Sequence, residues 1–492
     1  DGSRASVASA TFMAGTPPNT DSANPPEVRS ATLRRDLRLL NADAFAWAVM
    51  TGCGEAYFVA FGLASGLGEV ASGLLATVPL LIGAAVQMVS PWGIRRCGSL
   101  RTWIASNAGI QALSLLPLVV MAEVETVPAW AIFTLASIYW AAGLATAPAW
   151  NTWVTTLVPR TMRARFFAMR SRLAQVGLIV GLAIAAGLLQ WGRGGGFELQ
   201  AFGLVFLVAF LARLVSSVLL YRHSDAPSGF IDRIEPISRR ALAPFLAEGK
   251  GRLVLLYMLA VTMSVQVSGP FFTAYILEHL RFSYLELMGI NACTVLSKVA
   301  FLPLIGRFAK EQGPGRLLWI GGLAITPAAT LWLVSENFWY LLALQLAVGV
   351  GWACWEMATF LLVFDTIPES HRTPVLTLFN LANALAIVGG SVIGAVILRF
   401  TGVGAWGYAV LFGATGAMRL VTLFMLAAIA PIGLRERFKG RLLGLRTISV
   451  RPGASSIDLP LVEGEDAFEE ADESEPASQR EAADASEKRP PP

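Results

Sequence analysis

Long apolar blocks separated by short polar segments dominate the chain from about residue 41 to residue 431. About 20 apolar helical residues cross a bilayer core of about 30 Å, and twelve blocks reach that length. The blocks are continuous rather than alternating, which excludes a transmembrane β-barrel. The pattern predicts an all-α polytopic membrane protein with spans near 41–64, 69–91, 102–122, 128–150, 166–190, 200–221, 253–278, 284–307, 316–335, 338–362, 375–399 and 406–431.

Composition supports this class, because 55% of the 492 residues are hydrophobic and only 15% are charged. Average soluble chains are about 25% charged. The four cysteines and three histidines are scattered, so we expect neither a disulfide framework nor a metal site. The sequence contains no H-E-x-x-H, G-x-S-x-G or P-loop motif. We therefore expect a protein that is not an enzyme and that needs no cofactor.

The basic residues between the blocks predict the orientation of the chain. Arginines and lysines gather before the first block and after each even-numbered block, whereas the alternate loops hold few. By the positive-inside rule, both termini and the central loop face the cytoplasm of a bacterial inner (plasma) membrane. The basic residues that give the chain its net charge of +4 are thus concentrated in the loops expected to be cytoplasmic. We therefore expect membrane lipids as partners and no nucleic acid.

Polar segments divide the chain into two halves with tails. Residues 1–32 are rich in Ser, Ala, Thr and Pro and lack the apolar core of a signal peptide, and residues 433–492 are rich in acidic residues, Ala, Ser and Pro. Such compositions do not bury enough surface to fold, so both are expected to be disordered tails. Between them we expect two six-helix bundles, 33–222 and 252–432, joined by a cytoplasmic linker, 223–251.

The two halves repeat each other at a nearly fixed interval. Gly54, Gly98 and Arg101 each have a counterpart 215 residues later, in Gly269, Gly313 and Arg316. Further matches are Arg163 with Arg372, 209 residues apart, and Arg213 with Arg419. Two parallel six-span halves are the plan of transporters that rock around a central site.

With these features the chain resembles the major facilitator superfamily over roughly residues 33–435. The family loop between spans two and three reads approximately G-x-x-x-D-R-x-G-R-R, and here it reads PWGIRRCGSLR, with Arg96 and Gly98 matching. Arg95 takes the position of the Asp that helps to latch the outward-open state in the family. The second copy, GRFAKEQGPGR, has Lys310 at that position. The resemblance implies a transporter of an uncharacterised bacterial branch.

The resemblance implies that spans one, four, seven and ten line a central cavity, which makes Glu55 in span one the first candidate for proton coupling or for recognition of substrate charge. An intramembrane charge is costly and needs a reason. A structural hydrogen bond to a neighbouring helix is the alternative. Lys298 and Glu356, at comparable depth in spans eight and ten, are expected to form an ion pair, which is either purely structural or a switch opened by protonation of Glu356.

Aromatic and polar residues near these charges are candidates for the cavity wall, because aromatic rings beside polar groups suit stacking on a solute. Lipid-facing tryptophans are the alternative. The predicted cavity residues are Thr51, Tyr57, Trp150, Asn151, Gln266, Trp352 and Trp355. The predicted gating residues on the cytoplasmic loops are Arg95, Arg96, Gly98, Arg101, Arg163, Arg165, Gly306, Lys310, Gly313, Arg316 and Arg372.

The sequence thus predicts a monomeric secondary transporter that moves a small organic solute by alternating access, with protons as the coupling ion. An exporter of amphipathic, drug-like or lipid-like compounds is the first alternative. A non-transporting sensor or scaffold is the second, although buried charges such as Glu55 argue against it.

Overall fold

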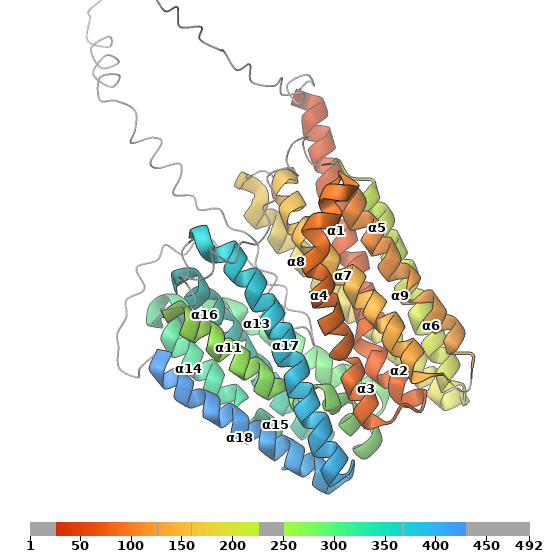
Figure 1. Cartoon of the computed structure of the whole chain (residues 1–492), viewed down its shortest axis with the longest axis vertical. Coiled ribbons are helices and arrows are strands. Elements are labelled where there is room, and N and C mark those ends of the chain that lie inside the picture. The colour runs from red at the N-terminus through yellow and green to blue at the C-terminus, as the bar shows by residue number, and fades with distance from the viewer. Residues whose placement is uncertain (1–25, 125–126, 159, 226–249, 367–368, 430–492) are drawn as a thin grey trace, which may run out of the picture.

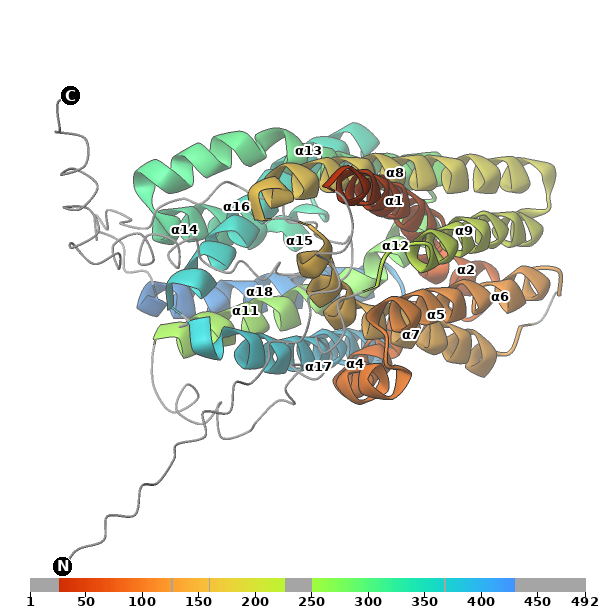
Figure 2. The ribbon, with the colours of Figure 1, turned by 90° about the horizontal axis from the view of Figure 1, so that it is seen from above.

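The helices form two bundles that lie side by side (Figures 1 and 2). The first bundle contains α1 to α9 and the second contains α11 to α18, and no strand occurs in the part of the chain that is described. The predicted all-α membrane fold in two helical halves is confirmed, and the span count is close to the predicted twelve. The structure is a computed structural model, and it describes residues 26–124, 127–158, 160–225, 250–366 and 369–429.

Each half contains long helices interrupted by short ones. The N-terminal half consists of α1 (Pro26–Cys53), the 3-10 helix η2 (Glu55–Tyr57), α2 (Phe58–Ala64), α3 (Glu69–Leu75), α4 (Val78–Cys97), α5 (Leu100–Leu113), α6 (Leu116–Met121), α7 (Ala129–Leu157), α8 (Arg160–Gly195) and α9 (Glu198–Tyr221). The C-terminal half consists of α11 (Lys250–Gln266), the 3-10 helix η4 (Gly269–Phe271), α12 (Phe272–Ala274), the π-helix η5 (Tyr275–His279), α13 (Tyr284–Gln312), α14 (Pro314–Ile325), α15 (Ala328–Leu331), α16 (Phe338–Thr366), α17 (Glu369–Thr401) and α18 (Ala405–Ile429).

Eleven helices in the described residues are long and apolar enough to cross a membrane, one fewer than the sequence predicts. The missing one is the ninth, because α14 ends at Ile325 and a new helix, α15, starts only after Pro327. Proline has no N–H to donate, so a helix is readily broken there. The guanidinium of Arg419 on α18 donates to the Ile325 carbonyl at 2.8 Å, which satisfies a backbone acceptor at the break.

One detail of the predicted boundaries differs from the structure. Helix α1 begins at Pro26, within the segment 1–32 that was expected to be a disordered tail. Proline suits the first helical position, and leucines at 33, 37 and 40 repeat at helical spacing. The predicted C-terminal tail, 433–492, and residues 226–249 of the linker lie outside the described residues.

Close helix contacts recur at the same place in both halves. Gly177 and Gly181 on α8 pack on the backbone of α1, and a Cβ on Gly177 would lie 2.6 Å from the Phe45 carbonyl oxygen. In the C-terminal half, Gly390 on α17 meets the backbone of α11 at Met263, and Gly394 meets the backbone of Val267, directly after α11. Small residues allow such approach between membrane helices. These glycines therefore serve helix packing.

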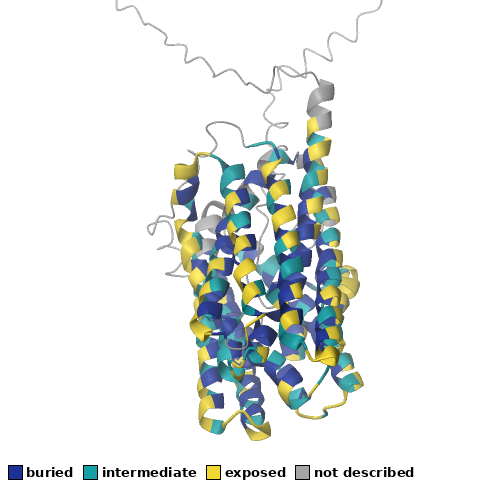
Figure 3. Cartoon of the chain, turned by 90° about the vertical axis from the view of Figure 1, so that its right-hand side faces the viewer, coloured by how far each residue is buried: buried dark blue, intermediate teal, exposed yellow. Residues whose placement is uncertain are grey.

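Burial follows the pattern of a bundle with a lipid-facing exterior. Buried residues concentrate on the inner faces of the helices, and exposed ones form the outer faces (Figure 3). Large apolar side chains on the outer faces are open, such as Phe400 and Phe424, which are 85% and 75% exposed. Apolar surface of this extent suits a bilayer rather than water. The chain is a multi-pass membrane protein by this arrangement and by its helix lengths.

Candidate functional site

The first helix of each half is broken at the same position of the repeat. Helix α1 ends at Cys53, and the 3-10 turn η2 follows Gly54; helix α11 ends at Gln266, and the 3-10 turn η4 starts at Gly269. These two glycines are 215 residues apart. Discontinuous helices at the interface of two repeats are a common way to build a transport site, because they free backbone and polar groups at mid-membrane.

Glu55 lies on the first of these turns, between α1 and α7. The hydroxyl of Tyr139 on α7 donates to Glu55 Oε2 at 3.1 Å. Tyr139 is itself buried, and its ring packs edge-on against Phe58 with the centroids 5.1 Å apart. Its sequence neighbours are apolar, and nothing in the sequence pattern singled out Tyr139. Glu55 is half-buried, and the Tyr139 hydroxyl that contacts its carboxylate also lies 2.9 Å from Met50 Sδ.

Thr51 and Tyr57, which were predicted to line the cavity, lie inside the N-terminal bundle instead. Thr51 is 4% exposed and its hydroxyl donates to the Trp47 carbonyl one turn earlier. The hydroxyl of Tyr57 donates to the Leu182 carbonyl of α8 at 3.2 Å. Both side chains are therefore used in packing within the bundle in this conformation, and their role in a substrate cavity stays a prediction.

The predicted contact between Lys298 and Glu356 is confirmed. Lys298 Nζ on α13 lies 2.6 Å from Glu356 Oε1 on α16, and the two side chains are only 24% and 19% exposed. The ring of Trp352 lies beside them, with its centroid 5.8 Å from the ammonium. The C-terminal half therefore contains a largely desolvated ion pair next to an aromatic face. Its functional role stays a prediction.

The other predicted cavity residues divide into two kinds. Trp352 and Gln266 are half-buried, and Gln266 is the last residue of α11, directly before its break. Trp355 is buried and its indole donates to the hydroxyl of Tyr257, which places it in the core of the C-terminal half.

Trp150 belongs to a charge cluster near the start of the transmembrane region of α8. The guanidinium carbon of Arg170 lies 4.0 Å from the centroid of the Trp150 ring, in cation–π contact. Arg170 also lies 3.8 Å from Asp43 of α1. Asp43 in turn accepts from Ser216, which accepts from the guanidinium of Arg213. This cluster ties α1, α8 and α9 together.

The loops after α4 and α13 share one feature that the repeat predicts, a glycine at the end of the helix. Gly98 and Gly313 both end a helix with a positive φ, 72° and 83°, a backbone region that favours glycine. Arg101 donates to the His223 carbonyl at 3.2 Å and lies 4.0 Å from Asp225, so it fastens this loop to the end of the sixth span. Arg316 donates to Gln312 within its own loop.

The remaining predicted gating residues give little information about the geometry of a gate. Arg95, Arg96 and Lys310 are exposed at helix ends, and Gly306 is buried within α13. The side chains of Asn151, Arg163, Arg165 and Arg372 lie outside the described residues.

Polar contacts between the halves lie at and near the end opposite the start of α1. Tyr408 at the start of α18 donates to Glu69 at the start of α3, and Tyr284 at the start of α13 donates to Glu198 at the start of α9. Thr77 and Ser391 exchange a hydrogen bond of 2.7 Å nearby. At this end α2 and α3 pack against the C-terminal half (Figure 1). None of these pairs was predicted from the sequence.

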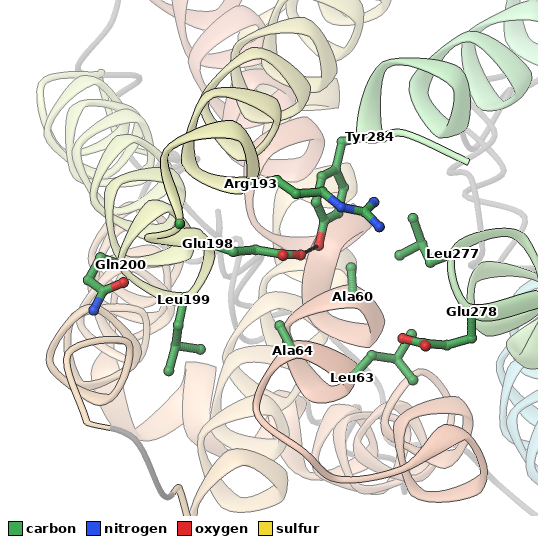
Figure 4. Close-up of a pocket in the computed structure, with 11 residues that line it drawn as sticks. Ala60, Leu63, Ala64, Arg193, Glu198, Leu199, Gln200, Leu277, Glu278 and Tyr284 are labelled. Carbon is green, nitrogen blue, oxygen red and sulfur yellow. Dashed lines mark hydrogen bonds between the residues drawn. The ribbon is translucent and has the colours of Figure 1, made fainter. Parts of the chain in front are cut away.

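A pocket of about 400 Å³ opens beside the Tyr284–Glu198 contact. Figure 4 shows Arg193 and Glu278 pointing toward it, with Ala60, Leu63 and Leu277 supplying apolar wall. The pocket is shared by both halves and lies at the end that we expect to face outward, not at the mid-membrane depth of Glu55.

Two sequence comparisons find relatives over part of the chain. The model of the family described as Major Facilitator Superfamily matches residues 254–452. Protein spinster homolog 1 of Rattus norvegicus is 26% identical over 154 residues, which are 31% of this chain and 29% of that protein. The chain thus matches less than a third of the length of this relative.

Solved structures are similar over most of the chain. A variant of the nucleoside transporter NupG aligns with a TM-score of 0.64 at 15% identity, covering 81% of this chain and 99% of that one. The E. coli fucose:proton symporter FucP aligns with a TM-score of 0.54 at 14% identity, over 81% and 99%. At such identities the likeness shows the fold.

Proposed function

Since this chain has the fold of the major facilitator superfamily and its C-terminal half matches the family model, we propose that it is a secondary transporter. Its cargo is a small organic solute, and it works by alternating access. The observation that carries the proposal is the ion pair between Lys298 and Glu356, 2.6 Å apart in the interior of a membrane bundle. Charges inside a membrane are expensive and usually mark a substrate or ion pathway.

Glu55 is the proposed proton carrier. Its carboxylate sits at the break of the first helix and accepts from Tyr139, so α1 and α7, two of the helices expected to line the cavity, share one titratable site. A carboxyl group can load a proton on one side and release it on the other as its surroundings change. The fold is also that of a protein described as a fucose:proton symporter, which is consistent with this coupling.

The conformation fits one stage of alternating access. The Glu69–Tyr408 and Glu198–Tyr284 contacts hold one end of the two halves together. By the positive-inside rule this is the outer end, so the protein is closed to the outside of a bacterial inner membrane, with both termini in the cytoplasm. Transport then requires these contacts to break and the inner ends of the halves to approach each other.

The test is uptake by purified protein in liposomes under an imposed proton gradient. Nucleosides and neutral sugars are the first solutes to offer, because the similar folds include a nucleoside transporter and a fucose:proton symporter. We expect one class to accumulate with the gradient and to stabilise the protein in a thermal-shift screen, as any ligand of the folded state does. Accumulation in inside-out vesicles alone would instead favour an exporter. The proposal is overturned if the protein neither binds nor transports any of the solutes offered: sugars, nucleosides, organic acids, peptides and amphipathic drugs.

A further inference from the structure

Two carboxylate–phenol contacts close the same end of the molecule. Glu69 accepts from the hydroxyl of Tyr408, and Glu198 accepts from the hydroxyl of Tyr284. In both cases the glutamate belongs to the N-terminal half and the tyrosine to the C-terminal half. The tyrosine side chains are almost fully buried, at 0% exposed for Tyr408 and 2% for Tyr284. A buried hydroxyl needs a partner, so these contacts are integral to the closed state.

The two contacts are related by the internal repeat. Glu69 and Tyr284 are 215 residues apart, the interval that also separates Gly54 from Gly269 and Gly98 from Gly313. Glu69 starts α3 in the second span of the first half, and Tyr284 starts α13 in the second span of the other half.

The partners also lie on equivalent spans, although 210 residues rather than 215 separate them. Glu198 is in the first turn of α9, the sixth span of its half, and Tyr408 is in the first turn of α18, the sixth span of the other. Each contact therefore joins the second span of one half to the sixth span of the other. In one contact the acid is on the second span and the phenol on the sixth, and in the other contact the two are reversed. The two contacts therefore join equivalent pairs of spans at the same end of the molecule.

Neighbouring groups surround each contact. His279 on the π-helix η5 places its Nε2 3.4 Å from Glu69 Oε2, and its ring meets that of Tyr408 with the centroids 4.7 Å apart. Beside the other contact, Arg193 donates to the Phe282 carbonyl at 3.3 Å, again from one half to the other. Both glutamates thus lie in a partly desolvated interface, where a hydrogen bond to a charged acceptor is stronger than in water.

We propose that Glu69–Tyr408 and Glu198–Tyr284 form a two-point outer latch that sets the equilibrium between the closed and the open outer face. This inference rests on the proposed function only in treating the closed end as a gate. The cytoplasmic loops of this chain have Arg95 and Lys310 where the resembled family has an acidic latch residue. The outer latch then supplies polar closure on the opposite face.

The latch is tested by removing only its hydroxyls. Tyr408→Phe and Tyr284→Phe keep the rings and delete the donors. Tyr340→Phe is the matched control, because the Tyr340 hydroxyl bonds the Leu331 carbonyl within one half, at the same end of the molecule. Spin labels at Val124 and Glu336, exposed positions on the outer loops of the two halves, report the separation by pulsed electron resonance. The four native cysteines are replaced by serine in this background.

We expect each single variant to raise the ratio of open to closed outer face about tenfold, the effect of losing one charge-assisted hydrogen bond. The double variant should raise it about a hundredfold if the two bonds act independently. A double variant with the same distance distribution as Tyr340→Phe would overturn the latch. Because the distance measurement needs no substrate, its result does not depend on whether the uptake assay succeeds.

If the phenylalanine variants do not yield a monodisperse protein, the acids are changed instead. Glu69→Gln and Glu198→Gln keep an acceptor for each tyrosine but remove its charge. The expected result is a smaller shift toward the open outer face, greater for the pair than for either alone. Labels that keep the closed distance in the double glutamine variant would overturn the latch.

Discussion

Lys298 Nζ lies 2.6 Å from Glu356 Oε1, whereas the half-buried acid of the other half, Glu55, accepts a hydrogen bond from the hydroxyl of Tyr139. The halves repeat each other in helix order, in broken helices and in loop glycines, but not in charge. Glu356 has a cation beside it, and Glu55 has the hydroxyl of Tyr139. This difference leads to different expectations for the two positions.

For the ion pair, breaking one partner should be worse than removing both. Lys298→Ala leaves the Glu356 carboxylate poorly solvated and without its cation, which is strongly destabilising. We expect Lys298→Ala with Glu356→Gln to be more stable than Lys298→Ala alone, with a coupling of about 1–3 kcal/mol in a double-mutant cycle. Thermal denaturation of the four purified proteins measures it, and strictly additive damage would show that the pair does not interact.

For Glu55, substitution by glutamine should separate two modes of transport. Glu55→Gln imitates the protonated acid, so a loaded carrier still turns and exchanges substrate across the membrane. The empty carrier of a proton symporter must lose its proton to return, so gradient-driven accumulation should fall to background. Exchange and accumulation are measured in the same liposomes, with Glu123→Gln, an exposed loop acid, as the control. Loss of exchange as well would make Glu55 a substrate ligand.

The glycine contacts predict a local difference along a single helix. On α8, a Cβ at Gly181 would collide with the backbone of α1 at Val49, whereas a Cβ at Gly187 meets nothing within 4 Å. Gly181→Ala should lower stability by about 1–3 kcal/mol through overpacking. Gly187→Ala should be neutral or slightly stabilising, because alanine is the better helix former. Equal melting temperatures for the two variants would contradict the close α1–α8 packing.

Topology is tested with a native residue. Cys97 is exposed at the end of α4, in a loop expected to face the cytoplasm. In a Cys293→Ser background, a membrane-impermeant maleimide should leave Cys97 unlabelled in intact cells and label it after permeabilisation. Cysteine introduced at Val124, on the opposite face, should show the reverse. Labelling of Cys97 from outside would invert the orientation of the whole chain.

Much of the fold could be predicted from the sequence because the signals are local. A run of apolar residues defines a span, and a glycine in the polar segment after a span, such as Gly98 or Gly313, marks the end of a helix. The ninth span shows the limit. Its residues are apolar enough for a continuous crossing, but Pro327 breaks it, and the arginine that stabilises the break lies on another helix, 94 residues away.

The site was less accessible to prediction, since it depends on which elements meet. Lys298 and Glu356 could be paired because two unlike charges in apolar spans have few other partners. Tyr408 and Glu69 are 339 residues apart, and their contact exists only when the two halves approach at one end. The repeat interval between Glu69 and Tyr284 was a usable signal, since it placed both at the same end of equivalent spans.

The bond from Arg419 to the Ile325 carbonyl has a consequence for biogenesis. Helix α14 has 12 residues and is about 18 Å long, too short to cross about 30 Å of lipid alone. As it leaves the translocon it exposes a broken end whose carbonyl has no donor until α18 is synthesised. The ninth span should therefore enter the bilayer late and together with the last one, and a chain truncated before Arg419 should leave it inserted inefficiently.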